Sequence, residues 1–535
     1  MILTTDTRRG RGYNSQTLAA LVALFVSFML PAVTCGQVSD QIDQLLSATW
    51  KEKGLEPSPA ASDQEFIRRA TLDIIGRIAT PEEVRAFEND KRPDKRARLI
   101  DRLLRSDEYP RYWAKVWSAW LIGRGGPPNR RQQLQAWLEK KFADDAGLDT
   151  IAIGLIAATG EGSENGAVHY ILAHLGEPVP ENKQMEEGRY DMVPLTLRTL
   201  QFFLGLRLQH NPRHPLHPDY YMRHFWRINV FFRQVDPGEN SVADNPKLNP
   251  EAYIVYENRE GKIFSATPRF LDDRKFDPKK GTSRRQQLAS FVVSHPNFAR
   301  AYVNRMWGKF FGRGLHEKPA VDDFGTHHKV IHPELLEALA KAFRRGGHRP
   351  KELVRWICHS RAYQLSSVAN KTNAGRDALP YFSRMPLRIM SPEQLLESII
   401  VATRAKEALA KNELAALRDG AAKMFDFDTE LGEWSFADNL QLAFAMINNK
   451  HINDAIVSPK GTVAHALKAS QGKPERIIDE LYLAALNRSP NDKEKDRVMT
   501  IIKESAAKKE IKDWTPLWQD LLWALINSNE FILNH

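Results

Sequence analysis

Apolar residues recur along much of the chain at the spacing of one helix face. In residues 112–121 large side chains return at i, i+3, i+4 and i+7, and residues 301–311 and 517–526 show the same stripe. The first stripe consists of Trp113, Val116, Trp117 and Trp120. Because such stripes are typical of helices that pack in a core, the pattern predicts a mainly α protein.

Several helix starts are marked by a cap that is followed by proline. Thr80 precedes a proline, and Glu83 stands three positions after the threonine, which is the arrangement of a capping box. Ser391 and Gln394 repeat this arrangement later in the chain. His332 also precedes a proline, so we expect it at the start of a helix.

One segment departs from the helical pattern. Residues 252–271 carry β-branched and aromatic residues on both sides of the sequence NREG, which predicts a β-hairpin between loop-like stretches. We therefore expect a multi-helix body in two units with a small β-hairpin insert. The predicted parts are a signal peptide (1–36), an N-terminal helical domain (37–235), a loop and β-hairpin connector (236–282) and a C-terminal helical domain (283–535). The alanine-rich residues 402–423 predict one charged helix.

The N-terminus has the layout of a secretory signal peptide. A basic stretch precedes an apolar run of 16 residues, and small residues around Cys35 lead into a polar chain. We expect cleavage after Gly36 and an exported protein in the periplasm or at the cell surface. A retained anchor and a lipid on Cys35 are the alternatives, and only these would bring the chain into contact with a membrane.

Cysteine usage limits the chemistry of the exported chain. The sequence contains 2 cysteines, Cys35 and Cys358. If the leader is removed, the remaining thiol forms no internal disulfide and no cysteine-based metal site. Cys358 lies in an apolar helical pattern, so we expect it to be buried rather than to act as a nucleophile.

The net charge of the chain bears on its surface and its partners rather than on its fold. The 535 residues carry a formal net charge of +10, and the basic residues are spread along the sequence. This distribution predicts a solvated basic surface, which can also attract an acidic polysaccharide. No recognisable nucleic-acid motif is present, so we expect no nucleic-acid partner.

Two long stretches resemble a known family. Residues 63–117, which begin DQEFIRRATLDIIGR, resemble the first of two paired domains of unknown function in planctomycete cytochrome-c-like exported proteins. Residues 284–343, which begin RRQQLASFVVSHPNF, resemble the second. The resemblance implies an exported, mainly helical protein whose biochemical activity is not established.

The sequence departs from this family at LGLRLQHNPRHPLHPDYY, residues 204–221. Many relatives carry a C-x-x-C-H haem-attachment pattern here, in which two thiols bind the haem and the histidine ligates iron. In this chain the thiol positions hold His210 and Arg213, and only the ligand position, His214, is kept. Covalent haem attachment is therefore excluded at this position, because no sulfur is present.

The same stretch offers a candidate metal site. His210, His214 and His217 supply three imidazoles that zinc or copper could bind. The prolines between them forbid a regular helix, so their spacing does not place them on one face. The other interpretations are a noncovalently bound haem and a proline-stiffened loop whose histidines bond to backbone groups.

Acidic residues and histidines also gather near residue 325. Asp322, Asp323 and His332, with His327 and His328 between them, could act as acid and base or bind a divalent metal. The alternative is a turn in which His332 caps the following helix. A third group, with weaker spacing, consists of Glu161, Glu164, His169 and His174.

These patterns contain packing signals and no strong catalytic motif. We expect a binding scaffold of unknown activity for a partner protein or an acidic polysaccharide, and we expect no cofactor. The first alternative is a hydrolase acting on exported or environmental glycans through Asp322, Asp323 and His332. The second is an electron-transfer relative that has lost covalent haem. Whether the protein is an enzyme stays open at this stage.

Overall fold

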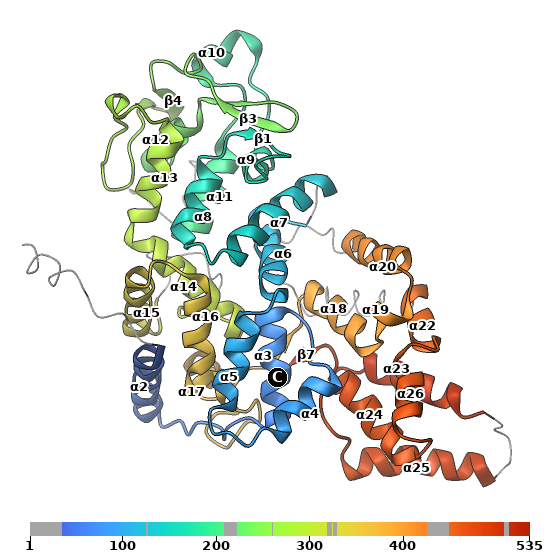
Figure 1. The fold of residues 1–535 in the computed structure, drawn as a ribbon. Coiled ribbons are helices and arrows are strands. Elements are labelled where there is room, and N and C mark those ends of the chain that lie inside the picture. Colours follow the sequence, from blue (N-terminus) through green and yellow to red (C-terminus); the bar gives the residue numbers. More distant parts are fainter. Residues whose placement is uncertain are drawn as a thin grey trace, which may run out of the picture.

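The computed structural model describes residues 35–124, 127–207, 222–258, 260–317, 324, 329–424, 449–507 and 513–535. In these residues the protein is mainly α, as the apolar periodicity predicts, with a few short antiparallel strands (Figure 1). Residues 1–34 of the predicted leader lie outside the described part of the chain. Among the helices that the structure describes, none is long and apolar enough to cross a membrane.

The first half of the chain is built from short and medium helices. They are α2 (Cys35–Lys53), α3 (Asp63–Ile75), α4 (Pro81–Asn89), α5 (Lys95–Leu104), α6 (Glu108–Ile122), α7 (Pro128–Ala143), α8 (Leu148–Ile156), α9 (Val168–Leu172), α10 (Gln184–Glu187), α11 (Val193–Leu204) and α12 (Met222–Asn229). The predicted stripe on α6 is largely buried, with Trp113 and Trp117 at the centre of the core.

The second half continues the helical architecture. Its helices are α13 (Arg284–Ser294), α14 (Pro296–Phe311), α15 (Pro333–Arg345), α16 (Pro350–His359), α17 (Arg361–Gln364), α18 (Pro392–Ala402), α19 (Ala405–Ala408), α20 (Lys411–Met424), α22 (Lys450–Val457), α23 (Thr462–Ala469), α24 (Pro474–Leu486), α25 (Asp492–Ala507) and α26 (Thr515–Ile526). Single 3-10 turns are η1 (Glu181–Lys183), η2 (Val230–Phe232), η3 (Pro278–Lys280) and η4 (Arg376–Tyr381).

The strands form three small antiparallel sheets in the described residues. They are β1 (Gly160–Glu161), β2 (Val235–Pro237), β3 (Ser241–Asp244), β4 (Ile254–Glu257), β5 (Ile263–Ala266), β6 (Arg388–Ile389) and β7 (Leu533–Asn534). The predicted hairpin is confirmed: β4 pairs with β5, with Ile254 opposite Ala266. The pair of β6 and β7 joins segments that are far apart in the sequence.

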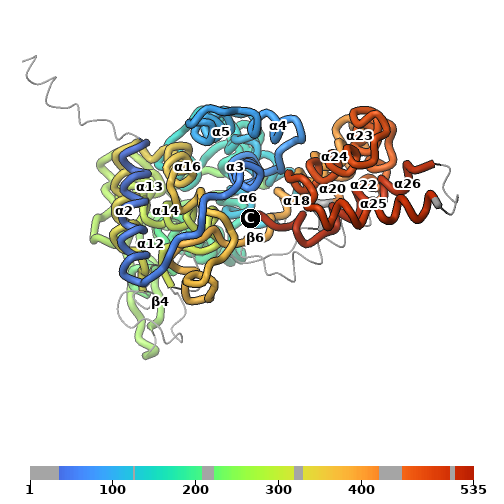
Figure 2. Tube along the Cα trace, turned by 90° about the horizontal axis from the view of Figure 1, so that it is seen from below, coloured from blue at the N-terminus to red at the C-terminus, as the bar shows by residue number. Residues whose placement is uncertain are grey.

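The apolar side chains form two main cores with α3 between them. The first core contains side chains from Val38 to Met385, together with Leu483, and the second contains side chains from Met390 to Ile532. Leu72 on α3 and Ile78 just after it belong to the second core, whereas most of α3 faces the first. In Figure 2 the helices of the second core, α18 to α26, lie to one side of the larger body.

The first core runs across the predicted connector, 236–282. Tyr302 on α14, for example, packs against Trp117 on α6 with ring centroids 5.8 Å apart. The packing of side chains therefore does not separate two domains at residues 236–282. The domain boundaries stay a prediction from sequence.

Local signals for helix starts are confirmed. Thr80 and Glu83 form both bonds of a capping box at α4, and Ser391 and Gln394 do the same at α18. Cys358 is fully buried on α16, as its apolar surroundings predict.

The expectation of one helix over residues 402–423 is wrong. The chain turns at Arg404, which has a left-handed φ of 52°, and again at Leu409, which is extended. The hydroxyl of the buried Thr462 donates a hydrogen bond of 2.7 Å to the carbonyl of Ala402, which a continuous helix would pair with its own backbone. This long-range bond divides the segment into the end of α18, α19 and α20.

Candidate functional site

The predicted site residues fall mostly outside the described residues. Asp322, Asp323, His210, His214 and His217 are all in segments that the structure does not describe. The acid–base and metal interpretations of these five side chains therefore stay predictions.

His332 is described, and its side chain is engaged in structure. It stands at the N-cap position of α15, as expected, but its side chain makes no capping bond. Its Nε2 instead donates a hydrogen bond of 2.8 Å to the carbonyl oxygen of Pro380, and its ring packs against Phe382. Burial lowers the pKa of His332 below its usual range. The imidazole is thus a neutral link between α15 and η4.

The third group of predicted residues, which the structure does describe, forms no metal-ligand cluster. His169 is fully buried and its Nε2 lies 2.5 Å from Oε1 of Gln133, whereas Glu161 and Glu164 are exposed. His174 donates from Nδ1 to the carbonyl of Tyr170 over 2.8 Å, and burial lowers its pKa to about 4. Across the described part of the chain, no three His, Cys, Asp or Glu side chains gather as metal ligands.

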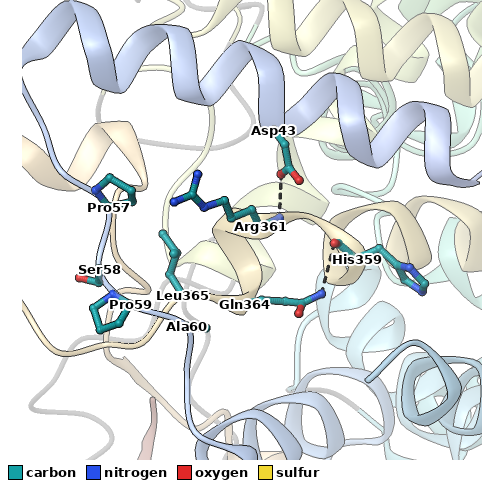
Figure 3. A pocket seen from close by; sticks show the side chains of 9 residues that line it. All are labelled: Asp43, Pro57, Ser58, Pro59, Ala60, His359, Arg361, Gln364 and Leu365. Carbon is teal, nitrogen blue, oxygen red and sulfur yellow. Dashed lines mark hydrogen bonds between the residues drawn. The ribbon is translucent and has the colours of Figure 1, made fainter. Parts of the chain in front are cut away.

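A pocket of about 510 Å³ opens between α2 and the junction of α16 and α17 (Figure 3). Its lining mixes apolar and polar side chains. The lining residues are Asp43, Pro57, Ser58, Pro59, Ala60, His359, Arg361, Gln364 and Leu365. Its volume lies within the range of small-ligand sites in proteins.

The backbone around Arg361 is fixed by three hydrogen bonds. Asp43 on α2 accepts the backbone N–H of Arg361 over 2.7 Å, and the hydroxyl of Ser360 accepts the backbone N–H of Tyr363 over 3.4 Å. Gln364 donates to the carbonyl of His359 over 3.2 Å. Figure 3 shows the first and third of these bonds near the backbone of Arg361, with the Arg361 side chain extending away from them. The pocket wall is therefore held in place without any use of the guanidinium.

The guanidinium of Arg361 has no ionic partner among the described residues. Its carbon lies 5.7 Å from the centroid of the Trp50 ring, which supports the side chain by a cation–π contact. The carboxylate of Asp43 is committed to the backbone of Arg361, and burial raises the pKa of this carboxyl. The arginine therefore presents unused donors to the pocket and to solvent.

The imidazole of His359 makes no bond to the other polar side chains of the pocket. Its imidazole points away from Arg361 (Figure 3), and burial lowers its pKa. Within the described residues its Nε2 has no hydrogen-bond partner and does not bond to Asp43. The lining consequently combines a guanidinium without an ion pair among the described residues with a carboxyl and an imidazole that do not bond to each other.

A second polar centre lies deeper, around Asp73 on α3. Arg388 donates to its two oxygens over 2.9 and 2.8 Å. The hydroxyl of Tyr363 and the side-chain amide of Asn534 add bonds of 2.9 Å each. Asp73 thus connects α3 to α17, β6 and β7.

Two family models match the sequence of this chain. A model described as PSCyt2, protein of unknown function (DUF1549), matches residues 41–237, and a model described as PSD1, protein of unknown function (DUF1553), matches residues 284–419. The two matches stand in the expected order and together cover most of the chain. The chain belongs to this PSCyt2–PSD1 family. No curated protein and no solved structure matches it.

The pocket and the Asp73 centre are both built from residues of the two matched domains. In this PSCyt2–PSD1 protein, Asp43 and Asp73 lie within the PSCyt2 match, whereas Arg361 and Arg388 lie within the PSD1 match. The pocket and the Asp73 centre therefore both form where the two domains meet.

Sequence reasoning did not identify Arg361. The only local signal is a cation at the first position of a helix, where the helix dipole disfavours positive charge. That Arg361 has no ionic partner depends on which carboxylates the fold brings near it, and the sequence around it does not contain this information.

Proposed function

We propose that this protein is an exported binding protein whose pocket at α2 and α17 holds an acidic saccharide unit. The observation that carries the proposal is the guanidinium of Arg361, which lines the pocket without an ionic partner among the described residues. A guanidinium matches the geometry of a carboxylate or sulfate through paired N–H donors.

The rest of the pocket supports a sugar rather than a bare ion. Pro57, Pro59 and Leu365 offer apolar surface, while Gln364 and Ser58 lie on the same lining. A saccharide presents both apolar C–H faces and hydroxyl groups. The formal net charge of +10 favours encounter with a polyanion. Export rests on the predicted leader, residues 1–36.

Binding of oligosaccharides to the purified chain tests this proposal. Calorimetry with oligogalacturonate, and with a neutral cello-oligosaccharide of equal length, should give measurable affinity for the acidic oligomer only. Arg361→Met should weaken that affinity at least about tenfold, since a hydrogen bond to a charged group contributes roughly 1.5–3 kcal/mol. Arg345→Met is the matched control, because Arg345 is an exposed arginine on α15 outside the pocket.

Two results would contradict the proposal. Equal affinity for acidic and neutral oligomers would remove the role of charge, and unchanged affinity in Arg361→Met would remove the role of this pocket. Hydrolysis of the same polymer depends on Asp322 and Asp323 and stays a prediction, as does electron transfer. No observation on the described residues favours either activity.

A further inference from the structure

Two buried hydrogen-bond donors without acceptors lie near a lysine amine where α6, α14 and β6 meet. The hydroxyl of Tyr112 on α6 is buried and has no partner in the described structure, and neither does Nε of Arg388 on β6. The amine of Lys309, on the last turn of α14, lies 5.7 Å from the centroid of the Tyr112 ring. Among the described residues this amine forms no ion pair. Buried donors normally find a partner, so two such donors beside a lysine without an ion pair require an explanation.

The carboxylates nearest to Lys309 are already committed to arginines. Asp73 accepts two bonds from Arg388, one from Tyr363 and one from Asn534. Glu393 is held by Arg124 through bonds of 3.0 and 3.2 Å. Neither carboxylate is left to neutralise the lysine.

The pKa values of the cluster reflect this allocation of partners. Although burial opposes its ionisation, Arg124 lowers the pKa of Glu393 to about 2. Burial lowers the pKa of Lys309 to about 8, and the charges of Asp73 and Glu393 oppose this shift only in part. Arg388 and Arg124 lower the pKa of Lys309 further.

The charges of the cluster do not balance. Three cations, Lys309, Arg388 and Arg124, face two carboxylates, those of Asp73 and Glu393. One added anion would bring the cluster to neutrality and would supply an acceptor to the lysine amine and to the two buried donors. The side chain of Lys309 is partly exposed, so a small ion can approach its amine from solvent, whereas Nε of Arg388 and the Tyr112 hydroxyl lie on the buried side of the cluster.

We propose that Lys309, Tyr112 and Arg388 bind a small oxyanion, a carboxylate or a phosphate group, at the junction of the PSCyt2 and PSD1 domains. Tyr112 belongs to the first domain match, and the two cations belong to the second. The bound oxyanion therefore links the two domains. This site is separate from the Arg361 pocket, whose lining contains none of these side chains.

Anion binding at this site is coupled to a proton on Lys309. The groups that face the amine are Asp73 from α3, Tyr112 from α6, Arg124 after α6, Arg388 from β6 and Glu393 from α18. An added anion raises the pKa of Lys309 from about 8, so binding takes up a proton when the solution is more alkaline than this. Affinity for the anion therefore falls as the pH rises above about 8.

Thermal unfolding of the full chain with added anions tests the site. Phosphate and acetate are each compared with chloride at equal ionic strength, at neutral and at clearly alkaline pH. At least one of the two oxyanions should raise Tm at neutral pH, and the increase should shrink at alkaline pH. An effect of phosphate alone assigns a phosphate group, and an effect of acetate alone assigns a carboxylate.

Variants separate the proposed site from general salt effects. Lys309→Met should abolish the increase in Tm, whereas Lys341→Met, at an exposed lysine on α15, should keep it. If Lys309→Met does not fold, Tyr112→Phe removes one donor and should weaken the anion at least severalfold. No anion effect on the native chain, or an equal effect in Lys309→Met and the control, would overturn the proposal.

Discussion

Two adjacent arginines on α3, Arg68 and Arg69, are fully buried and donate hydrogen bonds to backbone carbonyl groups. Arg68 donates to the carbonyls of Ala485 and Phe531 over 3.1 and 2.8 Å. Arg69 donates to those of Tyr363 and Leu365 over 2.6 and 2.9 Å. Burial lowers the pKa of Arg68 to about 10, yet the guanidinium stays charged at neutral pH. These two side chains thus hold segments from three distant parts of the sequence against one helix.

Asp73, one turn further along α3, is the residue whose loss should cost most. Asp73→Ala would leave Arg388, whose side chain is only 11% exposed, without its carboxylate, so we expect a loss of about 3–5 kcal/mol in the free energy of unfolding. Asp94→Ala removes an exposed ion pair with Arg98 and should cost less than about 1 kcal/mol. Urea unfolding of both variants checks the difference. Similar losses in the two would show that the buried network contributes little.

At the scale of elements, the local patterns of the sequence were reliable where structure depends on near neighbours. The apolar stripe of α6, the capping boxes at Thr80 and Ser391 and the β4–β5 hairpin all involve residues within a few positions of one another. The bond from Thr462 to Ala402 and the bonds to Asp73 join distant residues. Sequence periodicity carries no information on such pairings. The break after α18 depends on the bond from Thr462, and the candidate pocket depends on the long-range bond between Asp43 and Arg361.

The end of α3 depends on one glycine. Gly76 has a φ of 77°, and a Cβ at this position would overlap the ring of Tyr112. We expect Gly76→Ala to lower the free energy of unfolding by about 2–4 kcal/mol, because backbone strain and overpacking add.

Gly54, after α2, provides a matched control for this prediction. It has a similar φ of 63°, but a Cβ would meet nothing within 4 Å. Gly54→Ala should therefore cost only about 1 kcal/mol. Equal costs for the two substitutions in thermal unfolding would mean that the Tyr112 ring yields without penalty.

For the whole molecule, the two family domains share one core. The rings of Trp113 and Phe310 stack with centroids 6.4 Å apart, and those of Phe203 and Phe298 do so at the same distance, although each pair spans both matches. Each domain by itself would expose this aromatic surface to water. The pairing of the two domains in one chain therefore has a physical basis in packing.

Division of the chain tests the shared core. Residues 35–281 and 282–535, expressed separately, should be insoluble or lack cooperative unfolding, because each exposes half of the first core. The cut falls at an exposed turn after η3, so the same fragments produced together should associate into a soluble complex. Circular dichroism and size-exclusion chromatography check both outcomes. Two fragments that each unfold cooperatively would show that the shared aromatic contacts are dispensable.

The use of carbonyl oxygens by Arg68 and Arg69 has a consequence for how this protein can vary. A carbonyl is present at every position, whatever the side chain, so substitutions in the segments that the two arginines bind leave these hydrogen bonds intact. An insertion or deletion there would instead move each oxygen away from its guanidinium. We therefore expect related sequences to differ in residue type along these segments but to keep the same number of residues.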